Sequence, residues 1–141
     1  MNDRYGADDA ARLLGGLVGR VAAVTGAVAL SRGGMVLASA GLGREDAEHF
    51  AALVSGVQGL ARGACDRFAG GETLQTVIEM ERVLLFMAPA GADACLAVVS
   101  RADGDAGAVA YELAEVAGRL ADLGIAAPGT AGPRLSGTGA G

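Results

Sequence analysis

The longest stretch of helical periodicity in the chain covers residues 44–66. With Phe50 set at zero and about 100° added per residue, a group of small and apolar side chains falls within one arc. The group comprises Ala47, Phe50, Val54, Val57, Ala61, Ala64 and Cys65, with Ala51, Leu53 and Leu60 at its edges. An apolar face of this width predicts a helix that packs against a sheet.

The opposite side of this predicted helix has small residues where charged ones are expected. Its centre holds Ala52, Gly56, Gly59 and Gly63, and its flanks hold Glu48, Ser55, Arg62 and Asp66. A glycine inside a helix costs roughly 1 kcal/mol relative to alanine, so three on one stripe need an explanation. One explanation is an interface at which a second backbone approaches closely. The other is the abundance of glycine, which accounts for 24 of the 141 residues.

The same periodicity predicts one shorter helix near each end of the chain. The first is capped by Asp8 or Asp9 and runs to about Val21, and the last is capped by Asp103 or Asp105 and covers about residues 106–123. Their apolar stripes consist of Leu13, Leu14, Leu17, Val18 and Val21 in the first, and of Val109, Leu113, Val116, Leu120 and Leu123 in the last.

Five segments between these helices have the patterns of strands. They are residues 25–31, 35–39, 72–80, 83–88 and 94–100. The glycines at 33 and 34 favour a tight turn between the first two. Residues 72–80 alternate between apolar and polar, which is typical of a half-buried strand, whereas the last two segments are continuously apolar and predict buried strands. The order of elements predicts an α+β fold, with a five-stranded antiparallel sheet and helices on both faces.

The folded domain is expected to cover residues 8–123. A flexible arm at 1–7 is expected to precede it, and a disordered tail rich in glycine, proline and alanine, at 124–141, to follow it. The chain contains no apolar run long enough to span a membrane, and its first residues lack the basic and apolar regions of a signal peptide. We therefore expect a cytoplasmic protein without membrane insertion.

The overall composition excludes several kinds of function. Hydrophobic residues make up 52% of the chain, so the chain can build a core, and the net charge of −5 argues against a nucleic-acid surface. Lysine is missing, which excludes a phosphate-loop lysine and Schiff-base chemistry. Cys65 and Cys95 both lie within apolar patterns, so we interpret both as reduced core residues.

No group of residues in the sequence has the pattern of an active site. His49 is the only histidine, and Cys65 lies sixteen positions further along the same predicted helix. This separation is about 24 Å, too far for a Cys–His dyad within one chain, and one histidine with two distant cysteines lacks the spacing of zinc ligands. We therefore predict no catalytic residue, no bound metal and no cofactor.

The order of elements and several segments resemble the roadblock (dynein light chain) family, and above all its bacterial conservon-type members. Four segments carry the resemblance: LVGRVAAVTGAVALSRGGMVLAS, GREDAEHFAALVSGVQGLARGA, QTVIEME and ACLAVVS. Together they extend the resemblance over about residues 8–123. The chain departs at Gly43, where many relatives have a serine that caps the long helix.

The resemblance implies a particular quaternary arrangement. Family members are homodimers in which the strand at 72–80 pairs with its twin and the long helices pack antiparallel across the two-fold axis. The long helix would then cover one face of the sheet, and the first and last helices the other. The expected dimer contacts are Ala52, Gly56, Gly59, Gly63, Gln75, Val77 and Glu79.

The resemblance also implies a function. The family regulates or scaffolds small GTPases, and its conservon-type members are encoded beside a small Ras-like GTPase and a histidine-kinase-like sensor. We expect a non-enzymatic homodimer that binds such a GTPase, with Glu48, Ser55 and Arg62 as the residues facing it. The alternative is a scaffold that tethers a sensor histidine kinase without affecting GTP turnover. An arginine can stabilise phosphate charge on a GTPase in trans, but Arg62 can equally be a surface residue paired with Glu48 or Asp66.

Overall fold

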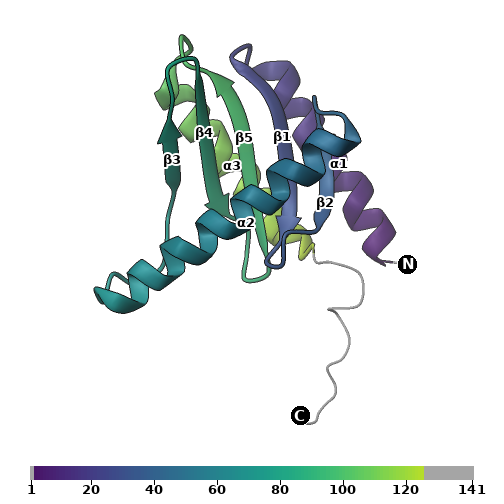
Figure 1. Ribbon diagram of the computed structural model, residues 1–141. Helices are drawn as coiled ribbons and strands as arrows, with labels where there is room; N and C mark the ends of the chain where they lie inside the picture. The colour runs from purple at the N-terminus through teal and green to yellow at the C-terminus, as the bar shows by residue number, and fades with distance from the viewer. Residues whose placement is uncertain (1, 126–141) are drawn as a thin grey trace.

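The computed structural model describes residues 2–125, with side chains from residue 6 onward. Residues 2–125 contain three helices and five strands (Figure 1). They are α1 (Asn2–Arg20), β1 (Val24–Ser31), β2 (Val36–Ala40), α2 (Arg44–Arg67), β3 (Thr76–Glu79), β4 (Val83–Pro89), β5 (Ala94–Arg101) and α3 (Ala106–Leu123). The predicted order of elements is confirmed.

The five strands form one antiparallel sheet in the order β2-β1-β5-β4-β3. The central pair joins strands that are distant in sequence, and Ala29 of β1 lies opposite Leu96 of β5. The last three strands make the predicted antiparallel meander. The fold class is therefore confirmed as α+β with a five-stranded antiparallel sheet.

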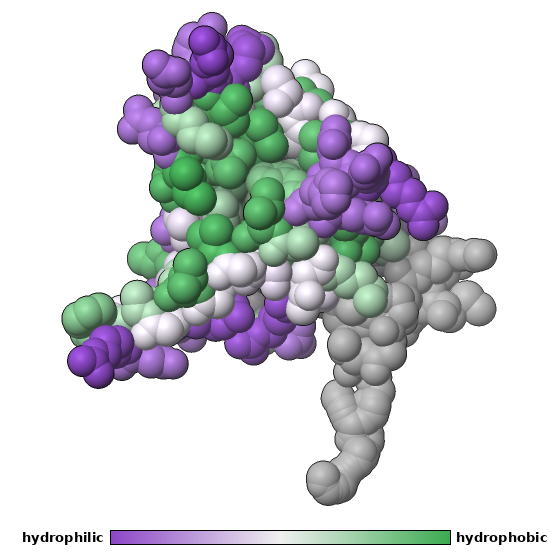
Figure 2. Space-filling model, viewed as in Figure 1, coloured by the Kyte–Doolittle hydropathy of each residue, from purple (hydrophilic) through white to green (hydrophobic). Residues whose placement is uncertain are grey.

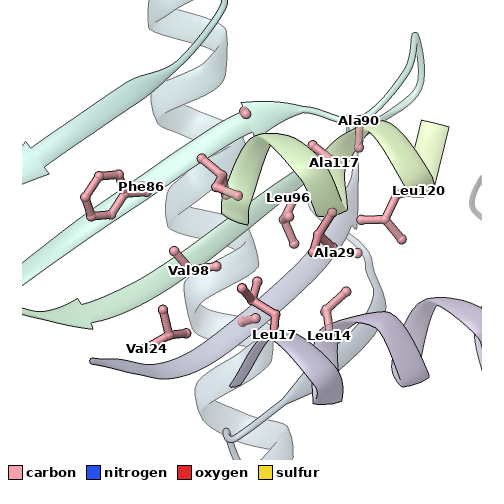
Figure 3. Close-up of a cluster of buried hydrophobic side chains, with 14 of the residues drawn as sticks. Leu14, Leu17, Val24, Ala29, Phe86, Ala90, Leu96, Val98, Ala117 and Leu120 are labelled. Atoms are coloured by element: carbon pink, nitrogen blue, oxygen red, sulfur yellow. The ribbon is translucent and has the colours of Figure 1, made fainter. Parts of the chain in front are cut away.

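The alternation of side chains along the strands gives the sheet two apolar faces. Helices α1 and α3 cover one face, where Leu14, Leu17 and Leu120 are fully buried. Figure 3 shows these leucines gathered around Ala29 and Leu96 of the central strands. The other face is covered by α2, whose Phe50 and Val54 pack with a second cluster of strand residues. These strand residues are Val28, Leu30, Met87, Cys95 and Ala97.

The ends of the domain differ from the prediction. Helix α1 begins at Asn2, so the expected flexible arm at 1–7 is wrong from residue 2 onward. The expected caps Asp8 and Asp9 therefore lie inside α1. At the other end, Gly124 caps α3 with a φ of 65° and Ile125 packs against the core, so the expected tail cannot start before residue 126. Residues 126–141 lie outside the described part.

Strand β3 is shorter than the expected strand at 72–80. Only Thr76–Glu79 pairs with β4, and Thr76 lies opposite Met87. Continued in the same register, Leu74 would face Pro89, which has no N–H to donate to the ladder. The strand therefore begins late, and Leu74 is left 83% exposed.

Only the first part of α2 packs on the sheet as expected. The buried residues of α2 are Ala47, Phe50, Ala51, Val54 and Gln58. Its C-terminal half extends past the sheet (Figure 1), so Ala64 is exposed and Val57, Ala61 and Cys65 are half-buried. Across residues 2–125, no helix combines the length and the apolarity needed to cross a bilayer.

Candidate protein interfaces on α2

Helix α2 begins and ends as its sequence suggests. Gly43 is the residue before its first turn and offers no side-chain cap, but its carbonyl accepts a hydrogen bond from Ala47 N at 2.9 Å. Glu45 and Asp46 lie in the first turn, where negative charge interacts favourably with the helix dipole. The helix closes with a bond from Phe68 N to Ala64 O. Its exposed surface has three parts with different chemistry.

The first part is the small-residue stripe, Ala52, Gly56, Gly59 and Gly63. A Cβ placed on Gly56 or Gly63 would meet nothing within 4 Å, and one on Gly59 would meet only the Arg62 guanidinium at 3.8 Å. The stripe therefore lies on open surface and its glycines are not required by packing within the protomer. It leaves room for the backbone of another element.

The second part is an apolar flank that the sequence analysis assigned to the edge of the sheet-facing arc. Leu53 is 67% exposed and Leu60 is 77% exposed. The buried residues centre on Ala51 and Val54, so the sheet-facing arc is rotated away from these two leucines. Figure 2 shows hydrophobic surface along α2 and on the adjoining part of the sheet. A small protein rarely exposes contiguous apolar area without a use for it.

Strand β3 forms one edge of the sheet, as the order of strands requires. Gln75, Val77 and Glu79 are exposed, while Ile78 packs against the α2 cluster. In the described residues no strand pairs with the outer side of β3. The expected dimer residues thus lie in two groups, one on the outer side of α2 and one at this edge.

The third part of α2 lines a pocket of about 730 Å³. Other walls come from the β1–β2 turn at Arg32, the segment at residues 71–73 and the β4–β5 loop. Ser55 and Arg62, two of the expected GTPase-facing residues, lie in this pocket. The third, Glu48, is not among the lining residues and instead forms an exposed ion pair with Arg44 at 3.6 Å. The structure therefore separates Glu48 from the other two.

Both cysteines line the same pocket, and both are free thiols. Cys95 is buried as expected, but Cys65 is half-buried and its Sγ lies 3.4 Å from Thr73 Oγ1. Burial raises the pKa of the Cys95 thiol from 9.0 to about 12, against smaller lowering effects of a hydrogen bond from the Ala88 backbone and of the Arg62 charge. A thiol with so high a pKa is a poor nucleophile at neutral pH.

The described residues contain no group of three or more His, Cys, Asp or Glu side chains that could hold a metal ion. His49 is exposed on α2.

Comparison with known proteins agrees with this architecture. Residues 11–100 match the Roadblock/LC7 domain. The crystal structure of a Roadblock/LC7 domain from Streptomyces avermitilis has a TM-score of 0.74 and 42% identity, with 76% of this chain and 90% of that chain covered.

Two MglB structures share the fold at lower identity. The gliding protein MglB from Thermus thermophilus has a TM-score of 0.76 and 20% identity, with 84% of this chain and 90% of that chain covered. MglB from Myxococcus xanthus has a TM-score of 0.76 and 18% identity, with 83% of this chain and 88% of that chain covered. Among curated proteins, none matches the chain significantly. The match over residues 11–100, together with the Streptomyces structure, shows that this chain belongs to the Roadblock/LC7 domain family.

Proposed function

We propose that the protein is a non-enzymatic homodimer that binds a small Ras-like GTPase and regulates its GTP turnover. The partner class comes from the resemblance to bacterial roadblock proteins, and family membership supports it. The single observation that carries the proposal is the exposed apolar flank of α2 at Leu53 and Leu60, beside a sheet whose edge strand β3 is open.

The dimer half of the proposal follows from the physics of these surfaces. Burying an exposed leucine contributes roughly 1.5–3 kcal/mol, and a two-fold axis buries each such residue twice. If β3 of a second protomer paired with this edge strand, it would also satisfy the unpaired backbone N–H and C=O groups of β3. The proposed dimer residues are Ala52, Gly56, Gly59, Gly63, Gln75, Val77 and Glu79, to which the structure adds Leu53 and Leu60 as exposed neighbours. A solved MglB structure is described as a tetrameric arrangement, which supports self-association as a property of this fold.

The GTPase half of the proposal uses the flank of α2 opposite Leu53 and Leu60. Glu48 and Arg62 are exposed there, whereas Ser55 is half-buried and donates a hydrogen bond to Arg32 O at 2.9 Å. Arg62 forms no ion pair within 4 Å in the described part of the chain. Its charge is thus available to a partner, while Ser55 serves mainly to hold the surface in shape.

The test is GTP hydrolysis by the small Ras-like GTPase that the resemblance implies is encoded beside this gene, measured as phosphate release with and without the protein. We expect the protein to bind the GTPase and to accelerate hydrolysis. Leu60→Arg should weaken both the dimer and the acceleration. Tyr111→Arg is the matched control, because Tyr111 is a large side chain that is 64% exposed on α3, on the other side of the sheet.

The outcomes separate the two candidate functions. If the two proteins do not bind, the proposal is wrong. If they bind and hydrolysis does not change, the result favours the scaffold that tethers a sensor histidine kinase.

A further inference from the structure

The pocket beside α2 lies on the flank of the helix that faces away from the apolar leucines. Ser55 and Arg62 line the pocket. Ser55 follows Leu53 by two positions, and Arg62 follows Leu60 by two positions. Two positions correspond to a rotation of about 200° around a helix, so the pocket and the leucines occupy opposite flanks. Dimer contacts made by Leu53 and Leu60 would therefore not cover the pocket. Its volume of about 730 Å³ is within the range of ligand-binding pockets.

Two contacts show how the charged residues are ordered along this pocket. Ser55 Oγ donates to Arg32 O at 2.9 Å, which places the backbone of Arg32 beside the middle of α2. Cys65 Sγ lies 3.4 Å from Thr73 Oγ1, which places Thr73 and its neighbour Glu72 beside the end of α2. Arg62 lies between these two points and Asp66 lies one helical turn further along α2, so the order along the pocket is Arg32, Arg62, and then Asp66 and Glu72.

The four charged residues of the lining are Arg32 and Arg62, and Asp66 and Glu72. Within residues 2–125, none of them forms an ion pair within 4 Å. The lining also includes the apolar side chains of Leu30, Ala94 and Cys95. The pocket thus combines apolar side chains with charges of both signs that do not neutralise each other.

Gln58 adds a buried hydrogen-bond donor to the same pocket. The residue is 7% exposed, and its Oε1 accepts a bond from Thr76 Oγ1 at 3.4 Å. Within residues 2–125 its amide nitrogen donates no hydrogen bond, and Gln58 is one of the residues that line the pocket. A buried donor left without an acceptor costs about 1–3 kcal/mol, so a ligand carbonyl would be favoured here.

We propose that this pocket binds an extended segment of a partner protein in which an acidic and a basic residue lie three to five positions apart. The acidic side chain pairs with Arg32 and Arg62, the basic one with Asp66 and Glu72, and a backbone carbonyl accepts from Gln58. The wall of α2 between Ser55 and Asp66 is about 16 Å long at 1.5 Å per residue. An extended peptide rises about 3.3 Å per residue, so four or five residues fill this length. The inference does not depend on the proposed function.

The probe is an acetylated and amidated pentapeptide with the sequence Glu-Ala-Val-Ala-Arg, and the control peptide has glutamine at both ends. Each is titrated to millimolar concentration into the full chain labelled with ¹⁵N, and amide shifts are followed by NMR. We expect saturable shifts at the Gln58 side-chain amide and around Arg62 with the charged peptide alone. Arg62→Glu should weaken binding by about tenfold, while Arg119→Glu, an exposed arginine of α3, should leave it unchanged.

A charge swap protects the test against simple misfolding of the variant. A pentapeptide with arginine at both ends should bind Arg62→Glu more tightly than it binds the unmodified chain. Equal binding of both peptides, or an Arg62→Glu variant that binds like the unmodified chain, would overturn the proposal. Absence of any saturable shift would overturn it as well, including the case in which a second copy or residues 126–141 already fill the pocket.

Discussion

Ser55 Oγ donates a 2.9 Å hydrogen bond to the carbonyl oxygen of Arg32, which joins the middle of α2 to the turn between β1 and β2. The turn fits closely against the helix at this point. Gly34 has a φ of 92°, and a Cβ placed on it would lie 3.2 Å from Ser55 Cβ. This connection fixes one wall of the charged pocket and holds α2 over the sheet.

Replacing Ser55 by alanine should therefore loosen the turn without unfolding the domain. A lost hydrogen bond of this kind lowers the free energy of unfolding by about 0.5–1.5 kcal/mol, which urea denaturation measures. Ser39→Ala is the control, because Ser39 is also half-buried but has no recorded side-chain bond in the described residues. Hydrogen exchange at Gly34 N, which donates to Ser31 O, should accelerate in the first variant alone. Equal losses in both variants would mean that the turn does not depend on Ser55.

Local patterns predicted most of the elements. The periodicity of α2 and α3 and the two buried strands depend on neighbours in sequence, and all were predicted within a residue or two. Of the two cap candidates for α3, Asp103 and Asp105, the structure has Asp105. The extent of β3 depends on Pro89 in another strand, so its own alternation could not reveal where pairing stops. The cap-type residues Asp8 and Asp9 lie inside α1, so they did not indicate where this helix begins.

The candidate surfaces were harder to predict, because they depend on the angle at which α2 crosses the sheet. A helical projection gives the direction of each side chain around the helix axis. It does not show how far along that axis the helix is in contact with the sheet. Leu53 and Leu60 therefore looked like the edge of the core, although they are exposed. The pocket brings together Arg32, Arg62 and Glu72 from segments far apart in the chain, and no spacing in the sequence indicates this.

Two substitutions on neighbouring residues distinguish the two exposed surfaces of α2. Leu60→Arg puts a charge on the apolar flank, and Gly59→Leu puts a side chain on the small-residue stripe. Both should lower the fraction of dimer in sedimentation velocity, because both surfaces belong to the proposed interface. A Cβ on Gly59 meets only the Arg62 guanidinium at 3.8 Å, so Gly59→Leu creates no clash within the protomer. Any effect of Gly59→Leu on the fraction of dimer therefore indicates that another protomer contacts this position.

The possible results for these two variants lead to different conclusions about the interface. A dimer that tolerates Gly59→Leu but not Leu60→Arg would restrict the interface to the apolar flank. A dimer that tolerates both would contradict the proposed interface on α2. Thermal melting should remain cooperative for both variants.

Replacing two of the glycines by alanine should change the free energy of unfolding in opposite directions. A Cβ on Gly26 would lie 2.6 Å from Leu42 Cγ, so Gly26→Ala forces Leu42 to move and should cost about 1–3 kcal/mol of unfolding free energy. A Cβ on Gly15 of α1 meets nothing within 4 Å, so Gly15→Ala should stabilise the helix by about 0.5–1 kcal/mol. Urea denaturation of both variants measures the difference. A Gly26→Ala variant as stable as the unmodified chain would show that Leu42 relaxes without cost.

The buried thiol of Cys95 predicts a loss of stability in alkaline solution. Its pKa is raised from 9.0 to about 12 by burial, so between these values the unfolded chain has lost the thiol proton while the folded chain retains it. The unfolded state then binds fewer protons than the native state, and stability falls as the pH rises through this window. The slope due to this one group is at most roughly 1.4 kcal/mol per pH unit.

The composition of the chain makes this effect measurable. The sequence has no lysine, which removes a side chain whose ordinary pKa falls within this window. We expect the free energy of unfolding, measured by urea denaturation in steps from pH 8 to pH 11, to decline above about pH 9. Cys95→Ala should flatten that decline, whereas Cys65→Ala, which changes a half-buried thiol, should leave most of it in place. An unchanged slope in Cys95→Ala would mean that Cys95 ionises as readily in the folded chain as in the unfolded one.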